Sequence, residues 1–64
     1  MYAINSQIKA QNIQPGMVID IYGNERFAVE QVAVKWGAVQ IRDHIDWRGL
    51  GENETVTVAG YFNL

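Results

Sequence analysis

The sequence predicts an all-β domain, either a small five-stranded barrel or a rolled antiparallel sheet. Short stretches alternate apolar and polar residues, as in Val39-Gln40-Ile41 and Thr55-Val56-Thr57-Val58. Turn-forming pairs such as Pro15-Gly16 and Gly23-Asn24 separate these stretches. No stretch sustains the apolar period of an amphipathic helix. Short strands joined by short turns account for all three observations, and closure into a barrel would leave no exposed sheet edge.

The first expected strand covers residues 2–10. Its apolar residues Tyr2, Ile4 and Ile8 are separated by even numbers of positions, which places them on one face of a strand. The four-residue interval between Ile4 and Ile8 also permits a short helix, although no capping residue follows. Residues 11–16 form a loop, from which we expect Ile13 to enter the core.

The second expected strand runs from Met17 to Tyr22 and follows a turn at Pro15-Gly16. Proline fixes φ at roughly −65° and glycine accepts a positive φ, so this pair sets the turn. Asp20 marks one face of the strand as polar, so the opposite face enters the core. That inward face consists of Met17, Ile19 and Ile21.

The third expected strand begins near Arg26. Its first apolar residues, Phe27 and Val29, share one face, whereas the valines that follow lie one position out of phase with them. A one-residue slip moves every side chain to the opposite face of a sheet. The shift at Gln31 therefore predicts a β-bulge or a strand that bends into another layer, and a turn follows at residues 34–38.

The fourth expected strand covers residues 38–42, with Val39 and Ile41 pointing inward. Ile45 and Trp47 keep the same phase, so we expect the strand to continue through Trp47 with both side chains inward.

The last part of the chain begins with a glycine-rich acidic loop at residues 48–54. Alternating threonine and valine then predict a strand at residues 55–59. The apolar end, residues 60–64, is expected to pack down, either closing the barrel or pairing with a partner.

The 64 residues make one domain, residues 1–64. A chain this short buries only about 60% of its unfolded surface, and it has no cysteine for a disulfide. Its net charge of −2 disfavours broad nucleic-acid binding. Apolar runs are too short for a transmembrane helix, and the N-terminus lacks the pattern of a signal peptide. We therefore expect a cytoplasmic protein that does not enter membranes.

The stretch Ile13-Gln14-Pro15-Gly16-Met17-Val18-Ile19, with Gly23-Asn24-Glu25-Arg26-Phe27-Ala28-Val29-Glu30, resembles the first hairpin of SH3-like and KOW-type small barrels. Within that group it is most similar to the N-terminal domain of elongation factor P. The resemblance implies a five-stranded SH3-like barrel. In that factor a lysine in the next glycine-rich hairpin loop is modified and acts at the ribosome. The corresponding turn here, Lys35-Trp36-Gly37-Ala38, is shorter and lacks the second lysine, so Lys35 does not inherit this role.

Residues 43–46 are the one cluster with a catalytic character, because imidazole and carboxylate can act as base and orienting group or bind a metal. On a strand, however, His44 and Asp46 share one face while Asp43 points away. Two ligands remain where a metal needs at least three. Gly49-Leu50-Gly51 lacks the lysine and helix of a phosphate-binding loop. We therefore expect a protein that is not an enzyme, with no catalytic residues, no metal and no cofactor.

Cationic and indole side chains interleave at two places, Lys35-Trp36 and Arg42 with Trp47-Arg48. Such surfaces stack bases or grip peptides, and tryptophan and arginine are enriched in protein–protein hot spots. The indoles could instead fill the ends of a barrel. Trp36, in a turn, is the one expected to be exposed. Trp47 shares the inward phase of the preceding strand and is expected in the core.

These residues predict a non-enzymatic binding or adaptor module with a protein partner. One alternative is a small barrel that binds RNA or single-stranded DNA, and another is a small regulator from a phage or mobile element. The acidic residues Asp43, Asp46, Glu52 and Glu54 could face a basic partner instead. We expect a monomer or a homodimer, the dimer forming through the apolar tail. The expected binding residues are Lys35, Trp36, Arg42, Trp47 and Arg48.

Overall fold

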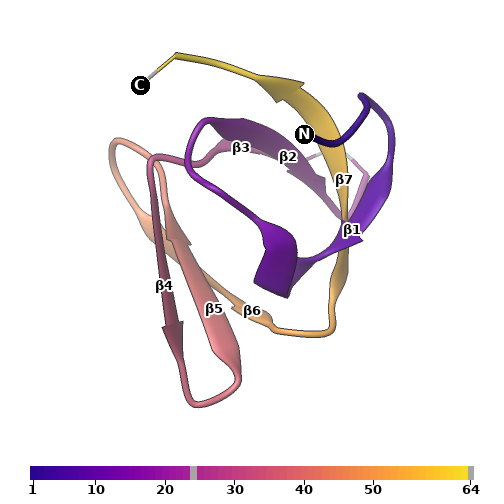
Figure 1. Cartoon of the computed structure of the whole chain (residues 1–64). Coiled ribbons are helices and arrows are strands. Elements are labelled where there is room, and N and C mark those ends of the chain that lie inside the picture. The colour runs from indigo at the N-terminus through magenta and orange to yellow at the C-terminus, as the bar shows by residue number, and fades with distance from the viewer. Residues whose placement is uncertain (24, 64) are drawn as a thin grey trace.

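The computed structural model describes residues 1–23 and 25–63. Within these residues the chain forms two antiparallel sheets and a short 3-10 turn, η1, at Ala10–Asn12 (Figure 1). The first sheet has the strand order β1-β7-β2-β3 and the second has the order β4-β5-β6. The first sheet consists of β1 Gln7–Lys9, β2 Met17–Ile21, β3 Glu25–Ala28 and β7 Thr55–Tyr61. The second consists of β4 Gln31–Lys35, β5 Ala38–Arg42 and β6 Trp47–Gly51.

The all-β prediction is confirmed, since the described residues contain no α-helix. Closure into a five-stranded barrel is not confirmed: the two sheets stay separate, and the described residues hold seven strands. Two differences account for the additional strands. The stretch after Arg26 is divided into β3 and β4, and the expected loop at residues 48–54 contains most of β6. In the part of the chain that is described, no helix is long and apolar enough to cross a membrane.

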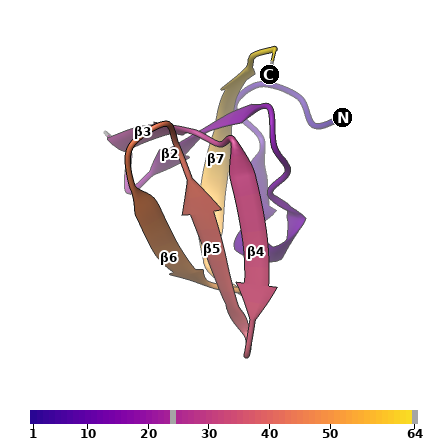
Figure 2. The same ribbon diagram turned by 90° about the vertical axis from the view of Figure 1, so that its left-hand side faces the viewer.

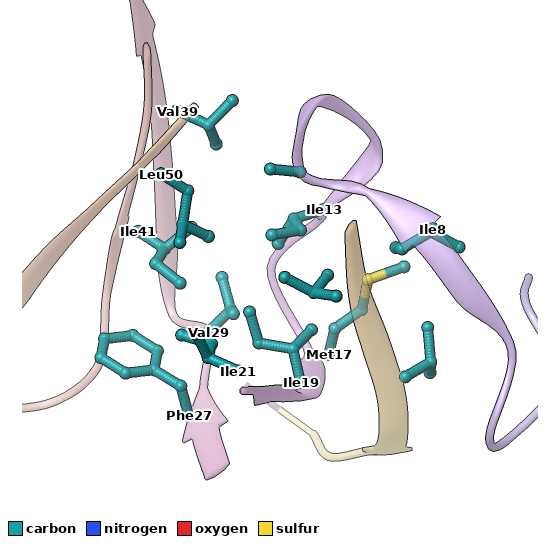
Figure 3. Packing of buried hydrophobic residues seen from close by; sticks show 13 residues of the cluster. Ile8, Ile13, Met17, Ile19, Ile21, Phe27, Val29, Val39, Ile41 and Leu50 are labelled. Atoms are coloured by element: carbon teal, nitrogen blue, oxygen red, sulfur yellow. The ribbon is translucent and has the colours of Figure 1, made fainter. Parts of the chain in front are cut away.

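The core lies between the two sheets, whose apolar faces point toward one another (Figure 3). Met17, Ile19 and Ile21 of β2 are buried, as the alternation predicts. Val39 and Ile41 of β5 are also buried as predicted and face them from the second sheet. Aliphatic residues fill most of this space, which suits two closely packed sheets.

The chain changes sheets at Val29 and Glu30. Val29 is fully buried, its N–H donates to the carbonyl of Met17 at 2.8 Å, and its carbonyl accepts from the N–H of Gly16 at 2.9 Å. The Glu30 N–H donates to the carbonyl of Arg42, in the second sheet, at 2.7 Å. The shift in the apolar pattern thus marks a bend into another layer, which is one of its two predicted outcomes.

The N-terminal strand is shorter than the predicted range of residues 2–10. β1 covers only Gln7–Lys9, although Asn5 and Ser6 also form backbone hydrogen bonds with Val58 of β7, and Ile4 is exposed. Ile13 is buried, as predicted. At the other end β7 continues past the predicted residue 59, because Tyr61 pairs with Met17 of β2. This pairing packs the tail down, while Leu64 lies outside the described residues.

Candidate binding surface

The strand register assigns alternate residues of β4, β5 and β6 to opposite sides of the second sheet. The buried residues Val39, Ile41 and Leu50 define the side that faces the core. The other side, here called the outer face, points away from the first sheet, and in Figure 2 its strands lie in front of the rest of the chain. The outer face consists of Gln31, Ala33, Lys35, Ala38, Gln40, Arg42, Trp47, Gly49 and Gly51.

Small residues flank the centre of the outer face. Ala33, Gln40 and Gly49 form one row across the three strands, and Ala38 and Gly51 stand opposite each other in another. A Cβ atom placed on Gly49 would meet nothing within 4 Å. Gln40 stands at the centre of the face, and the backbone is open to contact on either side of it, at Ala33 and Gly49.

A cation and an indole lie together at each end of the outer face. Nζ of Lys35 is 4.8 Å from the ring centroid of Trp36, and Cζ of Arg42 is 6.0 Å from that of Trp47. At such distances the ring quadrupole attracts the cation, by about 0.5–1 kcal/mol at an exposed site. Strand β5 separates the pairs by four residue steps, or roughly 13 Å at about 3.3 Å per residue.

The β4–β5 turn holds Trp36 in solvent. Trp36 and Gly37 both have positive φ, 53° and 75°, as in a two-residue type I′ hairpin turn. Such turns favour Asn-Gly, because a residue with a large side chain at positive φ costs about 1–2 kcal/mol. The Trp36 residue is 92% exposed, so its predicted exposure is confirmed and burial offsets little of that cost.

The predicted burial of Trp47 is wrong, since Trp47 is 52% exposed. Strand β5 ends at Arg42, and Asp43 closes a loop before β6. Oδ1 of Asp43 accepts the N–H groups of Ile45 and Asp46, both at 2.7 Å. The loop reverses the chain, so the inward phase of β5 is not carried across it. Ile45, also predicted inward, is 68% exposed for the same reason.

The carboxylate of Asp43 is engaged within the loop itself. The backbone N–H groups of Asp46 and then Ile45 lower the pKa of the Asp43 carboxyl below its ordinary value. His44 and Asp46 are exposed. Among residues 1–23 and 25–63, no three His, Asp or Glu side chains gather as a metal site would require.

Arg48 lies on the core side of the second sheet, away from the outer face. It stands opposite Ile41 in the β5–β6 register, and its guanidinium forms an ion pair with Glu25 of β3. This pair links β6 to β3 across the two sheets. The structure thus brings Lys35, Arg42 and Trp47 to the outer face with Trp36 at its end, and it separates Arg48 from them.

The acidic stretch after β6 is also held by contacts within the chain. The Gly51 N–H donates to Oε2 of Glu54 at 2.6 Å, and the Tyr22 hydroxyl donates to Oε1 at 2.9 Å. The bond from Gly51, followed by that from Tyr22, lowers the pKa of Glu54, while the bond to Glu54 raises the pKa of Tyr22. Glu54 therefore fixes the β6–β7 turn and the neighbouring β2–β3 turn.

A pocket of about 290 Å³ lies outside this surface, where the tail meets the Pro15-Gly16 turn. The Tyr61 hydroxyl beside it donates to the carbonyl of Tyr2 at 2.7 Å and accepts the Tyr2 N–H at 2.8 Å. None of the predicted binding residues lines the pocket, which is bounded by Met1, Gln14, Pro15, Gly16, Met17, Tyr61 and Phe62.

Sequence reasoning missed three contributors to the exposed surface. Gly49 and Gly51 were expected in a loop, and Val34, which is 63% exposed, was expected in a turn. The signal for β6 is weak, because two glycines lower its strand propensity. Trp36-Gly37 itself was the available clue to a two-residue hairpin turn.

No protein-family model, curated protein sequence or solved structure matches the chain. The likeness to SH3-like barrels and to elongation factor P stays a prediction, and the function has to be inferred from the surface itself.

Proposed function

We propose that this chain is a non-enzymatic protein-binding module whose outer face receives an extended, acidic segment of a partner protein. The observation that carries the proposal is Trp36. It stands at the tip of a hairpin, 92% exposed and at positive φ. Neither burial nor turn propensity favours tryptophan there, and residues kept in strained backbone regions cluster at functional sites. A role in binding would explain a tryptophan at position 36, since tryptophan is frequent among the anchor residues of protein interfaces.

Charge supports an acidic partner. Lys35 and Arg42 are the cations of the outer face, and within the described chain neither forms an ion pair. The strand positions of this face carry no carboxylate. Carboxylates of a partner would complement both cations and would meet the exposed edge of an indole at each end.

Shape supports an extended segment. The stretch between the two cation–indole pairs spans roughly 13 Å, which an extended chain crosses in about four residues. On either side of Gln40, Ala33 and Gly49 leave room for a backbone to lie close to the sheet. The proposed ligand therefore has two acidic residues about four positions apart, with small residues between them.

Titration of ¹⁵N-labelled protein with such peptides tests the proposal. Peptides with two aspartates four positions apart should shift the indole N–H signals of Trp36 and Trp47, while the same peptides with lysines should not. Gly49→Thr should weaken binding at least about tenfold by filling the space above Gly49, without loss of folding. Gly60→Thr is the matched control, because it adds the same side chain in β7, where a new Cβ also meets nothing within 4 Å.

Single-stranded oligonucleotides decide between the two classes of partner. Shifts with oligo-dT or oligo-U that weaken with salt, together with none for acidic peptides, would replace the proposal with nucleic-acid binding. The proposal also fails if acidic peptides bind Gly49→Thr as well as they bind the original protein.

A further inference from the structure

The second sheet has an edge strand without the usual protection against pairing. Among the described residues the outer strands of the two sheets are β1, β3, β4 and β6. β1 has three residues, β3 begins with Glu25-Arg26, and β6 contains two glycines and the Arg48 ion pair. Short length, charge and irregular backbone are the devices by which proteins keep edges from associating. β4 has five residues, an apolar centre, and a single charge at its end.

The backbone of β4 is available on its outer edge. Lys35 and Ala38 flank a two-residue turn, so they exchange both backbone hydrogen bonds, and such pairs alternate along the ladder. Val32 and Val34 therefore direct their N–H and C=O groups away from β5. Within the described chain no backbone hydrogen bond from outside the sheet reaches these groups. Figures 1 and 2 both show the β4–β5 hairpin extending beyond the first sheet.

We propose that β4 pairs antiparallel with β4 of a second copy of this chain, about a two-fold axis at Ala33. The sequence Gln31-Val32-Ala33-Val34-Lys35 is nearly the same read in either direction from Ala33. In this register Val32 stands opposite Val34 of the second copy, and the free N–H and C=O groups of both residues are paired. Ala33 stands opposite Ala33 of the second copy, and its methyl side chain is small enough for the two strands to pair there.

The apolar side of the pairing explains the exposure of Val34. Val34 lies on the core side of the sheet in one row with Val39 and Leu50, yet it is 63% exposed because the hairpin extends past the first sheet. Val32 of the second copy continues this row and covers Val34. The two three-stranded sheets become one six-stranded sheet with both outer faces on the same side. This pairing does not depend on the proposed peptide binding.

Sedimentation equilibrium across micromolar to millimolar concentrations tests the pairing. The original protein should reach the mass of two 7.2-kDa chains. Ala33→Glu places like charges directly opposite each other and should raise the dissociation constant at least about tenfold, as should Ala33→Lys. An equimolar mixture of these two variants should associate again. Gln40→Glu is the matched control, because it adds the same charge on the same face but on the inner strand β5, and it should dimerise normally.

Amide exchange provides a second measurement that needs no variant. The N–H groups of Val32 and Val34 should become protected as the concentration of the original protein rises. A protein that stays monomeric throughout refutes the pairing. So does a dimer in which these two amides exchange freely or in which Ala33→Glu associates unchanged, since another surface, such as the apolar tail, would then form it.

Discussion

The tryptophan at the hairpin tip should reduce the stability of the fold, and this can be measured by comparing Trp36→Asn with Trp36→Ala. Both changes remove the contact with Lys35, worth about 0.5–1 kcal/mol. Both also remove the small buried part of the indole, about 20 Å² if a tryptophan side chain presents about 250 Å², or about 0.5 kcal/mol. The two variants therefore differ mainly in how well each residue accepts φ of 53°.

Asparagine tolerates the left-handed region far better than alanine, and Asn-Gly is a preferred pair for this turn. We expect Trp36→Asn to be more stable than Trp36→Ala by about 1 kcal/mol, a visible fraction of the roughly 3–10 kcal/mol available to a chain of this length. For a domain of this size that difference raises the melting temperature by about 4–8 °C. The assay is thermal and urea unfolding, followed by circular dichroism and by the fluorescence of Trp47.

Equal melting temperatures for the two variants, or a higher one for alanine, would refute the argument that the turn strains this position. Tyr22 offers a parallel case, because it also precedes a glycine and has a φ of 58°. If both sites respond alike in stability but only the Trp36 variants lose peptide binding, strain and function are separated.

Three further changes test other parts of the structure. Glu54→Gln should flatten the loss of stability in acid, measured by urea unfolding between pH 6 and about pH 3. The Gly51 N–H lowers the pKa of Glu54 below its ordinary value of 4.5. The carboxylate therefore contributes fully to the free energy of unfolding above pH 4.5, and this contribution is lost as the pH falls through the pKa of the folded state. An identical pH profile in the variant would contradict this role. Gly16→Ala should cost about 1–2 kcal/mol, because φ is 96° and the new Cβ would lie 3.4 Å from a backbone carbonyl; an unchanged urea midpoint would count against it. Ile19→Val should cost about 0.5–1.5 kcal/mol in the same assay, since Ile19 is fully buried, and no cost would mean that the core is loosely packed there.

Strand alternation was sufficient to predict the buried faces of the central strands. The inward sides of β2 and β5 follow directly from the spacing of Ile19, Ile21, Val39 and Ile41, because the polar residues between them leave one apolar face. The same reasoning failed at Trp47. There the side chain of Asp43 closes a loop through two backbone N–H groups, and a pattern with a period of two does not register a reversal of the chain.

The open arrangement of two sheets and the shape of the candidate surface were harder to predict. The apolar shift at Gln31 left a bulge and a change of layer equally open, and only the hydrogen bonds of Val29 and Glu30 distinguish them. Charge and aromatic content identified Lys35, Trp36 and Arg42, but the separation of Arg48 depends on which way β6 faces. The direction in which β6 faces can be predicted only if Gly49 is assigned to a strand, and the low strand propensity of glycine argues against that assignment.

The link at Val29 and Glu30 also has a mechanical consequence. Two successive residues form backbone hydrogen bonds with different layers. Val29 bonds to Met17 and Gly16, and Glu30 bonds to Arg42. A force applied at Arg42 by a bound partner is therefore transmitted through two residues, Glu30 and Val29, to Met17 of β2. A ligand seated on one layer is thus attached, through this short link, to the interior of the whole domain.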